Sequence, residues 1–215
     1  MTYCLDMALA PQDAPRRRGG RKPDPSRDTA IMAGALDVLA EVGFEAMTID
    51  MVAARVKAGK GTVYRRWPSK TELVLDAVAH MERDEVRIEA LPDTGSLRED
   101  IVALIRPQSS EQDARRLQVM GGLLSISSLD PRLAETAFEA GTGNWIEANR
   151  LLIARALERG EFAGGDVETL ARVIPFMCTC RVSLLQQPIT REFLLELIDG
   201  VLIPAMRGST PSPPR

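Results

Sequence analysis

The sequence predicts an all-α protein, with an N-terminal three-helix domain that contains a helix-turn-helix and a larger C-terminal helical domain. From residue 28 onward, apolar residues recur at spacings of three and four along most of the chain, which is the period of an amphipathic helix. Glycine and proline stand where these stripes stop, and the second half contains no convincing strand pattern. The apolar fraction of 45% suffices for a sizeable core, and no run of 18 apolar residues predicts a membrane span.

Residues 1–26 are predicted to form a disordered basic arm, because they hold four prolines, an arginine-rich cluster and little apolar material. Such a cluster can be a solvated tail, or an arm that reaches DNA phosphates or the minor groove. Its position directly before the helix-turn-helix favours the second interpretation, with Arg21 and Lys22 as contacts. The first helix is predicted over 28–42, with Gly43 as its stop.

Two short helices on a tight turn follow, over 49–56 and 60–67, with the turn at 57–59. No acidic residue occurs between Met51 and Thr71, whereas six basic residues do. A helix-turn-helix with a cationic second helix is typical of proteins that read the DNA major groove. Val63 and Trp67 are predicted to pack inside this domain.

This stretch resembles the DNA-binding domain of the TetR/AcrR family of bacterial transcriptional regulators. The resemblance rests on K-G-T-V-Y at 60–64 and W-P-S-K at 67–70, and it covers residues 28–73. The remaining two thirds of the chain resemble the family only in length and helical pattern. The family usually has glycine where this chain has Lys57, so two turn geometries are open: Lys57 takes a positive φ, or the turn is shifted and Gly59 takes it.

The resemblance implies DNA contacts along the second short helix and beside it. Lys60, Gly61 and Thr62 begin that helix, where unpaired N–H groups and the positive end of the helix dipole favour groove edges and phosphates. Arg65 suits either a guanine or a phosphate. The predicted DNA-binding residues are Thr48, Lys60, Gly61, Thr62, Tyr64, Arg65, Arg66 and Lys70, together with Arg21 and Lys22 of the arm.

A fourth helix is predicted over 70–88, opened by Ser69 as its cap and linking the head of the molecule to its body. Five further helices follow, at about 96–106, 112–127, 131–159, 166–186 and 190–207. An interruption of the third is expected near the glycines at 141 and 143, because glycine weakens a helix, and Pro175 is expected to kink the fourth. The predicted divisions are a disordered arm (1–26), a DNA-binding domain (27–75), a helical ligand-binding and dimerisation domain (76–207) and a disordered tail (208–215).

The net charge of −3 conceals an asymmetry. Up to Lys70 the chain has 12 basic and 8 acidic residues, and after it 15 basic and 22 acidic, so a basic head precedes an acidic body. The local field of the head would steer DNA. Three cysteines and no secretory leader predict a cytoplasmic protein.

Catalytic, cofactor and metal chemistry find no support in the sequence. Cys178 and Cys180 are two apart on a helix and point in different directions, and the single histidine, His80, is far away in sequence. Two small buried cysteines are the preferred interpretation. No nucleophile motif or phosphate-binding loop occurs, so we predict that the protein is not an enzyme and has no cofactor.

The family resemblance implies a mostly apolar cavity in the body that takes a small-molecule effector. The candidates are Met120, Leu124, Trp145, Asn149, Phe176 and Met177, although core packing is the default explanation for each. Arg181 lies in an otherwise apolar helix and needs a partner there. The last two helices are expected to form the dimer interface in a four-helix arrangement, and the final one carries a broad apolar stripe with Phe193, Leu194, Leu197, Ile198 and Val201.

Together these features predict a ligand-responsive transcriptional regulator that binds double-stranded DNA as a homodimer. Repression is the usual mode of the family, with a near-palindromic operator released by a small molecule. Two alternatives stay open. One is an all-α carrier or enzyme without DNA binding, which the acid-free basic window disfavours. The other is a regulator controlled by a partner protein instead of a ligand.

Overall fold

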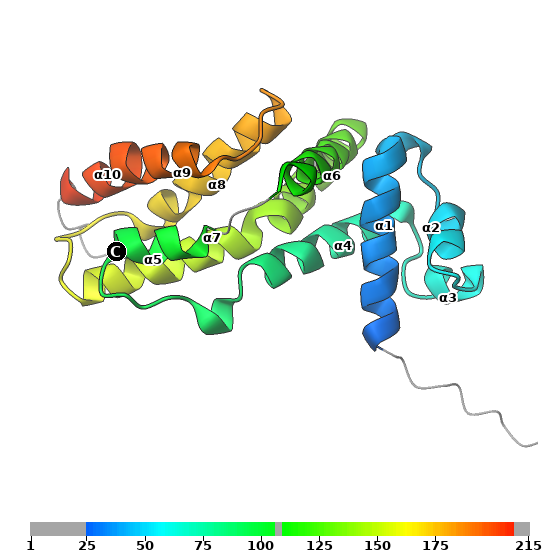
Figure 1. The fold of residues 1–215 in the computed structure, drawn as a ribbon, viewed down its shortest axis with the longest axis horizontal. Helices are drawn as coiled ribbons and strands as arrows, with labels where there is room; N and C mark the ends of the chain where they lie inside the picture. The colour runs from blue at the N-terminus through cyan, green and yellow to red at the C-terminus, as the bar shows by residue number, and fades with distance from the viewer. Residues whose placement is uncertain (1–24, 106–108, 209–215) are drawn as a thin grey trace, which may run out of the picture.

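The computed structural model describes residues 25–105 and 109–208, and the predicted arm contacts Arg21 and Lys22 lie outside these residues. The described residues contain ten α-helices, two short 3₁₀ turns, one π-helical segment and no strand, which confirms the all-α prediction. Figure 1 shows an elongated molecule, with α1, α2 and α3 gathered at one end and α4 running from that end into the body.

The head contains four helices whose bounds follow the predicted pattern closely. They are α1 (Pro25–Ala46), α2 (Ile49–Arg55), α3 (Lys60–Tyr64) and α4 (Lys70–Glu85). Gly43 breaks α1 as predicted, with φ 75° and ψ 167°, and one further turn follows it. The helix α4 ends three residues earlier than predicted, because Val86 adopts an extended conformation.

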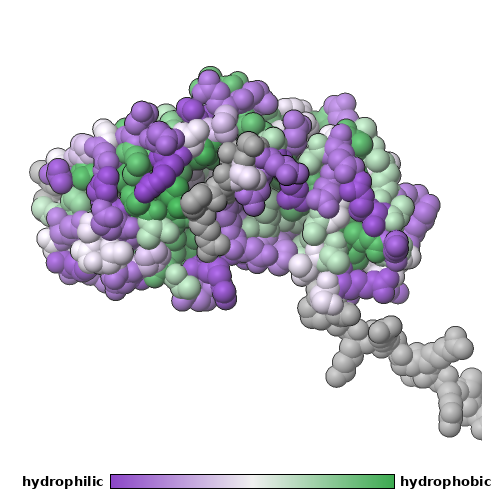
Figure 2. All heavy atoms as spheres, in the orientation of Figure 1, coloured by the Kyte–Doolittle hydropathy of each residue, from purple (hydrophilic) through white to green (hydrophobic). Residues whose placement is uncertain are grey.

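The body holds the remaining elements. They are η1 (Ile88–Ala90), α5 (Leu97–Leu104), α6 (Ser110–Leu129), η2 (Pro131–Leu133), α7 (Ala134–Glu158), α8 (Val167–Ser183), α9 (Arg191–Leu197), the π segment η3 (Ile198–Leu202) and α10 (Ile203–Gly208). In Figure 1, α8, α9 and α10 lie along one long side of the body, opposite α5 and α7. On the face in Figure 2, hydrophobic residues gather on the body between α5 and the α9–α10 segment.

Two predicted features of the body helices are wrong. The expected interruption near Gly141 does not occur, since α7 is continuous, and a Cβ on Gly141 would lie 2.8 Å from Leu123 Cδ1 of α6. The glycine therefore lets two helices pack closely, which offsets its low helix propensity. The last helix, predicted as one element over 190–207, is divided by the π segment. The helix α8 continues through Pro175.

The hydrophobic core of the head extends into the body. Its buried cluster includes residues of α1 to α4 together with Val119, Leu123 and Ile126 of α6 and Ala137 of α7. A second cluster lies between α5, α7, α8 and the C-terminal helices. Because α4 packs against α1 as well as against α6 and α7, a displacement of α4 would also move the head. The domain boundary at residue 75 stays a prediction.

Candidate nucleic-acid interface and ligand cavity

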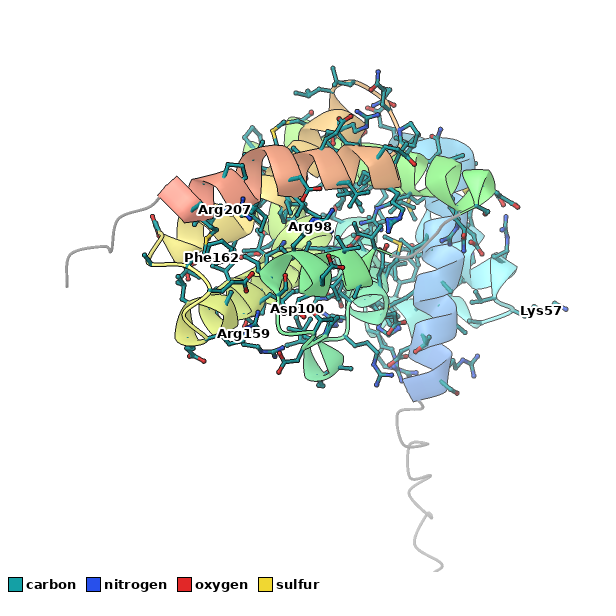
Figure 3. All side chains as sticks on the ribbon, turned by 60° about the vertical axis from the view of Figure 1, so that its left-hand side comes forward. Lys57, Arg98, Asp100, Arg159, Phe162 and Arg207 are labelled. Carbon is teal, nitrogen blue, oxygen red and sulfur yellow. The ribbon has the colours of Figure 1, made fainter. Side chains whose placement is uncertain are left out.

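The turn of the helix-turn-helix adopts the first of the two predicted geometries. Lys57 has φ 50°, while Gly59 is extended, with φ −68° and ψ 134°. A left-handed conformation costs a non-glycine residue about 1 kcal/mol. Figure 3 shows the Lys57 side chain projecting away from the body of the molecule beyond the head, where a polyanion can approach it.

Local contacts hold the two short helices in place. Thr48 caps α2, because its Oγ1 accepts a hydrogen bond from Met51 N at 3.2 Å. Val63 is completely buried and Trp67 is nearly so, and Trp67 Nε1 donates to Asp76 Oδ2 of α4 at 2.8 Å. Both residues pack the domain as predicted. Their burial on one side of α3 turns Lys60, Gly61, Tyr64 and Arg65 toward solvent.

Ion pairs occupy three of the basic residues in the acid-free window. Lys60 Nζ bonds Asp50 Oδ2, Arg55 bonds Glu41, and Arg66 bonds Asp28 at the start of α1. The Asp50 carboxylate raises the pKa of Lys60 by accepting a hydrogen bond from its ammonium. Arg66 is only 23% exposed in its side chain, so it ties α1 to the motif. A phosphate contact by Arg66 would have to replace that pair.

Lys70, a predicted phosphate contact, is held by bonds within the head. Its ammonium donates to three backbone carbonyls at the end of α1, those of Phe44 (2.8 Å), Glu45 (2.9 Å) and Met47 (3.2 Å). It also lies 4.7 Å from the centre of the Phe44 ring. These contacts use all three N–H groups of the side chain. Lys70 therefore caps the chain reversal after Gly43, and a phosphate contact by this side chain would have to replace these bonds.

Lys57 and Arg65 are left as the exposed cations of the motif, and neither has an ion-pair partner among the described residues. Tyr64 lies beside them with 47% of its surface exposed. Gly61 is also exposed, and a Cβ placed on it would meet no atom within 4 Å. This tip can approach DNA without first breaking internal contacts.

The body encloses a cavity of about 360 Å³ between α4, α5, α6, α7, α8 and the start of α9. Met120, Trp145 and Asn149 line it, as predicted. Leu124, Phe176 and Met177, which were predicted as ligand contacts, do not line this cavity and are 41%, 47% and 45% exposed. On α8 the lining comes from Ile174, Pro175, Cys178 and Val182, which lie on the other side of that helix.

A buried ionic cluster joins the cavity to the end of α4. Glu82 is completely buried, and its carboxylate accepts hydrogen bonds from Arg116 Nη2 at 2.9 and 3.0 Å and from Trp145 Nε1 at 2.8 Å. Arg116 Nη1 donates to Glu85. Burial raises the pKa of Glu82 to about 7, against the opposing effect of Arg116. The sequence signal was present, because Glu82 continues the apolar stripe of α4 four residues after Val78.

Asn149 is 2% exposed and lines the cavity, and its Nδ2 has no hydrogen-bond partner among the described residues. Two hydroxyls of the lining donate within their own helices, Thr142 Oγ1 to Phe138 O at 2.7 Å and Thr179 Oγ1 to Pro175 O at 2.9 Å. Burial raises the pKa of the Cys178 thiol to about 12, so it stays protonated. Cys180 is exposed, which corrects the prediction of two buried cysteines.

The predicted dimer residues divide into two groups. Leu197 and Ile198 are buried within the protomer and Leu194 lines the cavity, so these three do not offer a free surface. Phe193 is half-buried, with the Arg181 guanidinium 4.3 Å from its ring, and Arg181 Nε donates to Pro188 O at 2.7 Å. Val201 is 45% exposed, as a surface residue should be. The apolar stripe of the last helix is wide enough to cover both a face buried in the protomer and a face exposed to solvent. The spacing of apolar residues alone does not show which residue belongs to which face.

The described residues contain no cluster of three potential metal ligands and no helix both long and apolar enough to cross a membrane.

Comparison with known proteins identifies both parts of the chain. The sequence model described as bacterial regulatory proteins, tetR family, matches residues 31–77, and that of the tetracyclin repressor-like C-terminal domain matches residues 91–201. An uncharacterised HTH-type transcriptional regulator of Mycobacterium tuberculosis is 31% identical over 195 residues, which are 88% of this chain and 95% of that protein. The DNA-binding transcriptional repressor TetR of Mycobacteroides abscessus is 32% identical over 187 residues, 85% of this chain and 95% of the relative. Among solved structures, a TetR family transcription regulator superposes with a TM-score of 0.58 and 23% identity, over 81% of this chain and 95% of that chain, which shows a shared fold.

Proposed function

The chain belongs to the tetR family of bacterial transcriptional regulators, and on that premise we propose that it is a repressor that binds a near-palindromic operator as a homodimer and is released by a small molecule. DNA binding and transcriptional regulation follow from the family, whose members are regulators and not enzymes. We assign DNA binding to residues 27–75, and effector binding and dimerisation to 76–207. The observation that carries the proposal is the exposed cationic tip of the helix-turn-helix, formed by Lys57, Tyr64 and Arg65.

The tip suits DNA because it places two exposed cations without ion-pair partners among the described residues at the two ends of a short helix, Lys57 before α3 and Arg65 at its C-terminal cap. Arg65 can bond a guanine edge or a phosphate, and Thr62 stands one turn before it on α3. Thr48 and Lys60 adjoin this surface, and Lys60 can exchange its exposed Asp50 pair for a phosphate at little cost. One short helix contacts too few base edges for specificity, so two matched half-sites are expected.

Footprinting of the purified protein on the DNA upstream of its own coding sequence tests this function. We expect two protected half-sites whose centres lie about one helical turn apart, roughly 34–36 Å, and affinity that falls steeply with salt. Removal of residues 1–22 should lower the affinity without moving the footprint. Binding that is independent of salt, or retention on neither DNA nor heparin, would contradict the proposal.

An exposed apolar stripe on α8 supports a dimer. Phe176, Met177, Cys180 and Leu184 recur at i, i+1, i+4 and i+8, and Leu184 is 71% exposed. Val201 provides a further exposed apolar side chain on η3, which contacts α8. A helix face this apolar is normally covered, and a self-complementary pairing of two α8 helices with the adjacent C-terminal helices would cover it. The proposed interface therefore centres on α8 and Val201, instead of on Leu194, Leu197 and Ile198.

Met177→Glu and Leu184→Glu should each convert the dimer to monomers, because a symmetric interface buries each new carboxylate twice. Sedimentation velocity measures the result directly. Val42→Glu is the matched control, since Val42 is 39% exposed on α1 in the head and should leave the dimer intact. Unchanged dimers in both α8 variants would place the interface elsewhere.

Release by a ligand is supported by the contacts between the cavity and α4. Arg116 and Trp145 line the cavity and bond the Glu82 carboxylate of α4. Asn144 Nδ2 secures the end of the same helix through the carbonyls of Glu82 (3.0 Å) and Val86 (2.6 Å). A ligand that binds better to one position of α4 than to another would shift the heads relative to the DNA grooves.

A further inference from the structure

The polar groups of the cavity wall restrict the chemistry of the effector. Apolar side chains from α5, α8 and α9 form one part of the wall, and the Trp145 indole presents another apolar surface. A volume of about 360 Å³ lies at the small end of the range for small-molecule sites, roughly 300–1,000 Å³. A ligand here must be compact and largely apolar, so its few polar atoms need definite partners.

Asn149 provides one such partner. Of the buried side-chain nitrogen and oxygen atoms without a partner in residues 25–105 and 109–208, only Asn149 Nδ2 belongs to a cavity-lining residue. A buried amide N–H without an acceptor is costly, and a ligand oxygen in hydrogen-bond reach would satisfy it. The Thr142 and Thr179 hydroxyls already donate to backbone carbonyls, so they do not compete for that oxygen as donors.

Charged ligands find no equally good partner in the interior. Arg116 is the buried cation of the lining, but Glu82 and Glu85 both bond its guanidinium, and a ligand carboxylate there would meet two acidic side chains. Arg191 also lines the cavity, but it lies at the start of α9 and is exposed to solvent. A ligand ammonium would have to take Glu85 from Arg116, which would leave a buried guanidinium incompletely paired.

We propose that the effector is an uncharged, largely apolar molecule with a carbonyl-type oxygen that accepts a hydrogen bond from Asn149 Nδ2. The inference rests on the proposed function only where it predicts release of DNA, because binding of the effector to the protein can be measured without DNA. Its structural basis is the unpaired amide in an apolar cavity whose buried arginine is already matched by two carboxylates.

Calorimetric titration of the full chain with three ten-carbon probes tests the proposal. Decan-2-one is neutral and offers only an acceptor, decanoate is an anion, and decylammonium is a cation. We expect the ketone to bind at least about tenfold more tightly than either ion, because a buried charge without a partner is penalised far more than a carbonyl. Equal affinities, or tighter binding of either ion, would overturn the proposal.

Two variants and one control isolate the role of Asn149. Asn149→Leu should lower ketone affinity about fivefold by removing the hydrogen bond, and should raise the Tm of the ligand-free protein by removing the unpaired amide. Asn149→Asp has nearly the same shape and should reverse the preference toward decylammonium. Ser128→Ala, which removes an exposed hydroxyl outside the cavity that donates to Leu124 O at 2.9 Å, should leave ketone affinity within about twofold. Unchanged ketone affinity in Asn149→Leu, or no reversal in Asn149→Asp, would overturn the assignment.

Failure of this inference can be distinguished from failure of the proposed function. If ketone binding depends on Asn149 but leaves DNA affinity unchanged, the hypothesis of DNA release by a ligand fails and the proposed ligand chemistry stands. If a compound releases DNA but binds equally well to the Asn149 variants, the hypothesis of DNA release by a ligand stands and the proposed ligand chemistry fails.

Discussion

Arg65→Ala is expected to weaken DNA binding by about tenfold without changing the Tm, because a good side-chain contact to a base contributes about 1–3 kcal/mol. Arg65 is the exposed C-terminal cap residue of α3 and has no ion-pair partner among the described residues, so its removal costs the free protein nothing. If Arg65 holds a phosphate, the slope of log affinity against log salt should fall by about one unit. If it bonds a guanine, preference at one or two operator positions should relax instead.

Lys70→Met should give the opposite result. The variant keeps the aliphatic stem but loses the ammonium that bonds the carbonyls of Phe44, Glu45 and Met47, at a cost of about 2–3 kcal/mol. The Tm should fall by roughly 4–10 °C for a chain of this size. At 20 °C the folded variant should bind DNA within about threefold of the wild type, since Lys70 contacts the protein and not the phosphate.

Fluorescence anisotropy with the footprinted DNA and thermal unfolding by circular dichroism measure the two properties separately. Arg83→Ala is the matched control, because it removes an exposed arginine from the far end of α4 and should change neither. A salt slope that falls by one unit in Lys70→Met, with an unchanged Tm, would restore Lys70 as a phosphate contact.

The sequence predicted those elements of the head that depend on neighbouring residues. Ser69 caps α4 as its position indicated, and Gly43 stops the main part of α1. The turn was ambiguous because Lys57 and Gly59 could both be assigned the positive φ, and only the three-dimensional structure shows that Lys57 takes it. The acid-free stretch of sequence identified a basic motif, but it did not show which of its cations form ion pairs with other described residues.

Contacts between distant residues were beyond the reach of periodicity. Lys70 bonds carbonyls that precede it by 23 to 26 residues, and Arg116 bonds a glutamate 34 residues earlier. The apolar pattern also left the side of a helix undetermined where both sides are apolar. On α8 it pointed to Phe176 and Met177 as ligand contacts, whereas the cavity is lined by Cys178 and Val182. On the last helix it did not separate buried Ile198 from exposed Val201.

Arg116→Met is expected to have the largest effect on stability of any single substitution proposed for this protein. Arg116 is 17% exposed in its side chain and bonds the fully buried Glu82 and the 18% exposed Glu85. Breaking a buried ion pair from one side costs about 3–5 kcal/mol, because it leaves an uncompensated charge. For a chain of this length the Tm should fall by roughly 10–15 °C.

The loss of stability in Arg116→Met should increase with pH. Burial already raises the pKa of Glu82 to about 7, above the value near 4.5 expected for the unfolded chain. The folded state therefore binds the proton more strongly in that interval, and stability falls as the pH rises through it. Without Arg116 the pKa of Glu82 should rise further, so the pH range over which stability falls extends above pH 7. The stability that Arg116→Met loses relative to the wild type should therefore be larger at pH 8 than at pH 6.

A second substitution separates charge from packing in this cluster. Glu82→Gln removes the buried charge but keeps an oxygen that can accept from Trp145 Nε1, so Arg116→Met combined with Glu82→Gln should recover most of the lost stability at pH 8. Thermal unfolding of both single variants and the double variant at pH 6 and pH 8 provides the measurement. A loss in Arg116→Met that is the same at both pH values and is not recovered in the double variant would show that packing, and not the buried carboxylate, holds the end of α4. The double variant should still bind DNA but respond less to a cavity ligand, because the neutral pair no longer connects the cavity wall to α4 by charge.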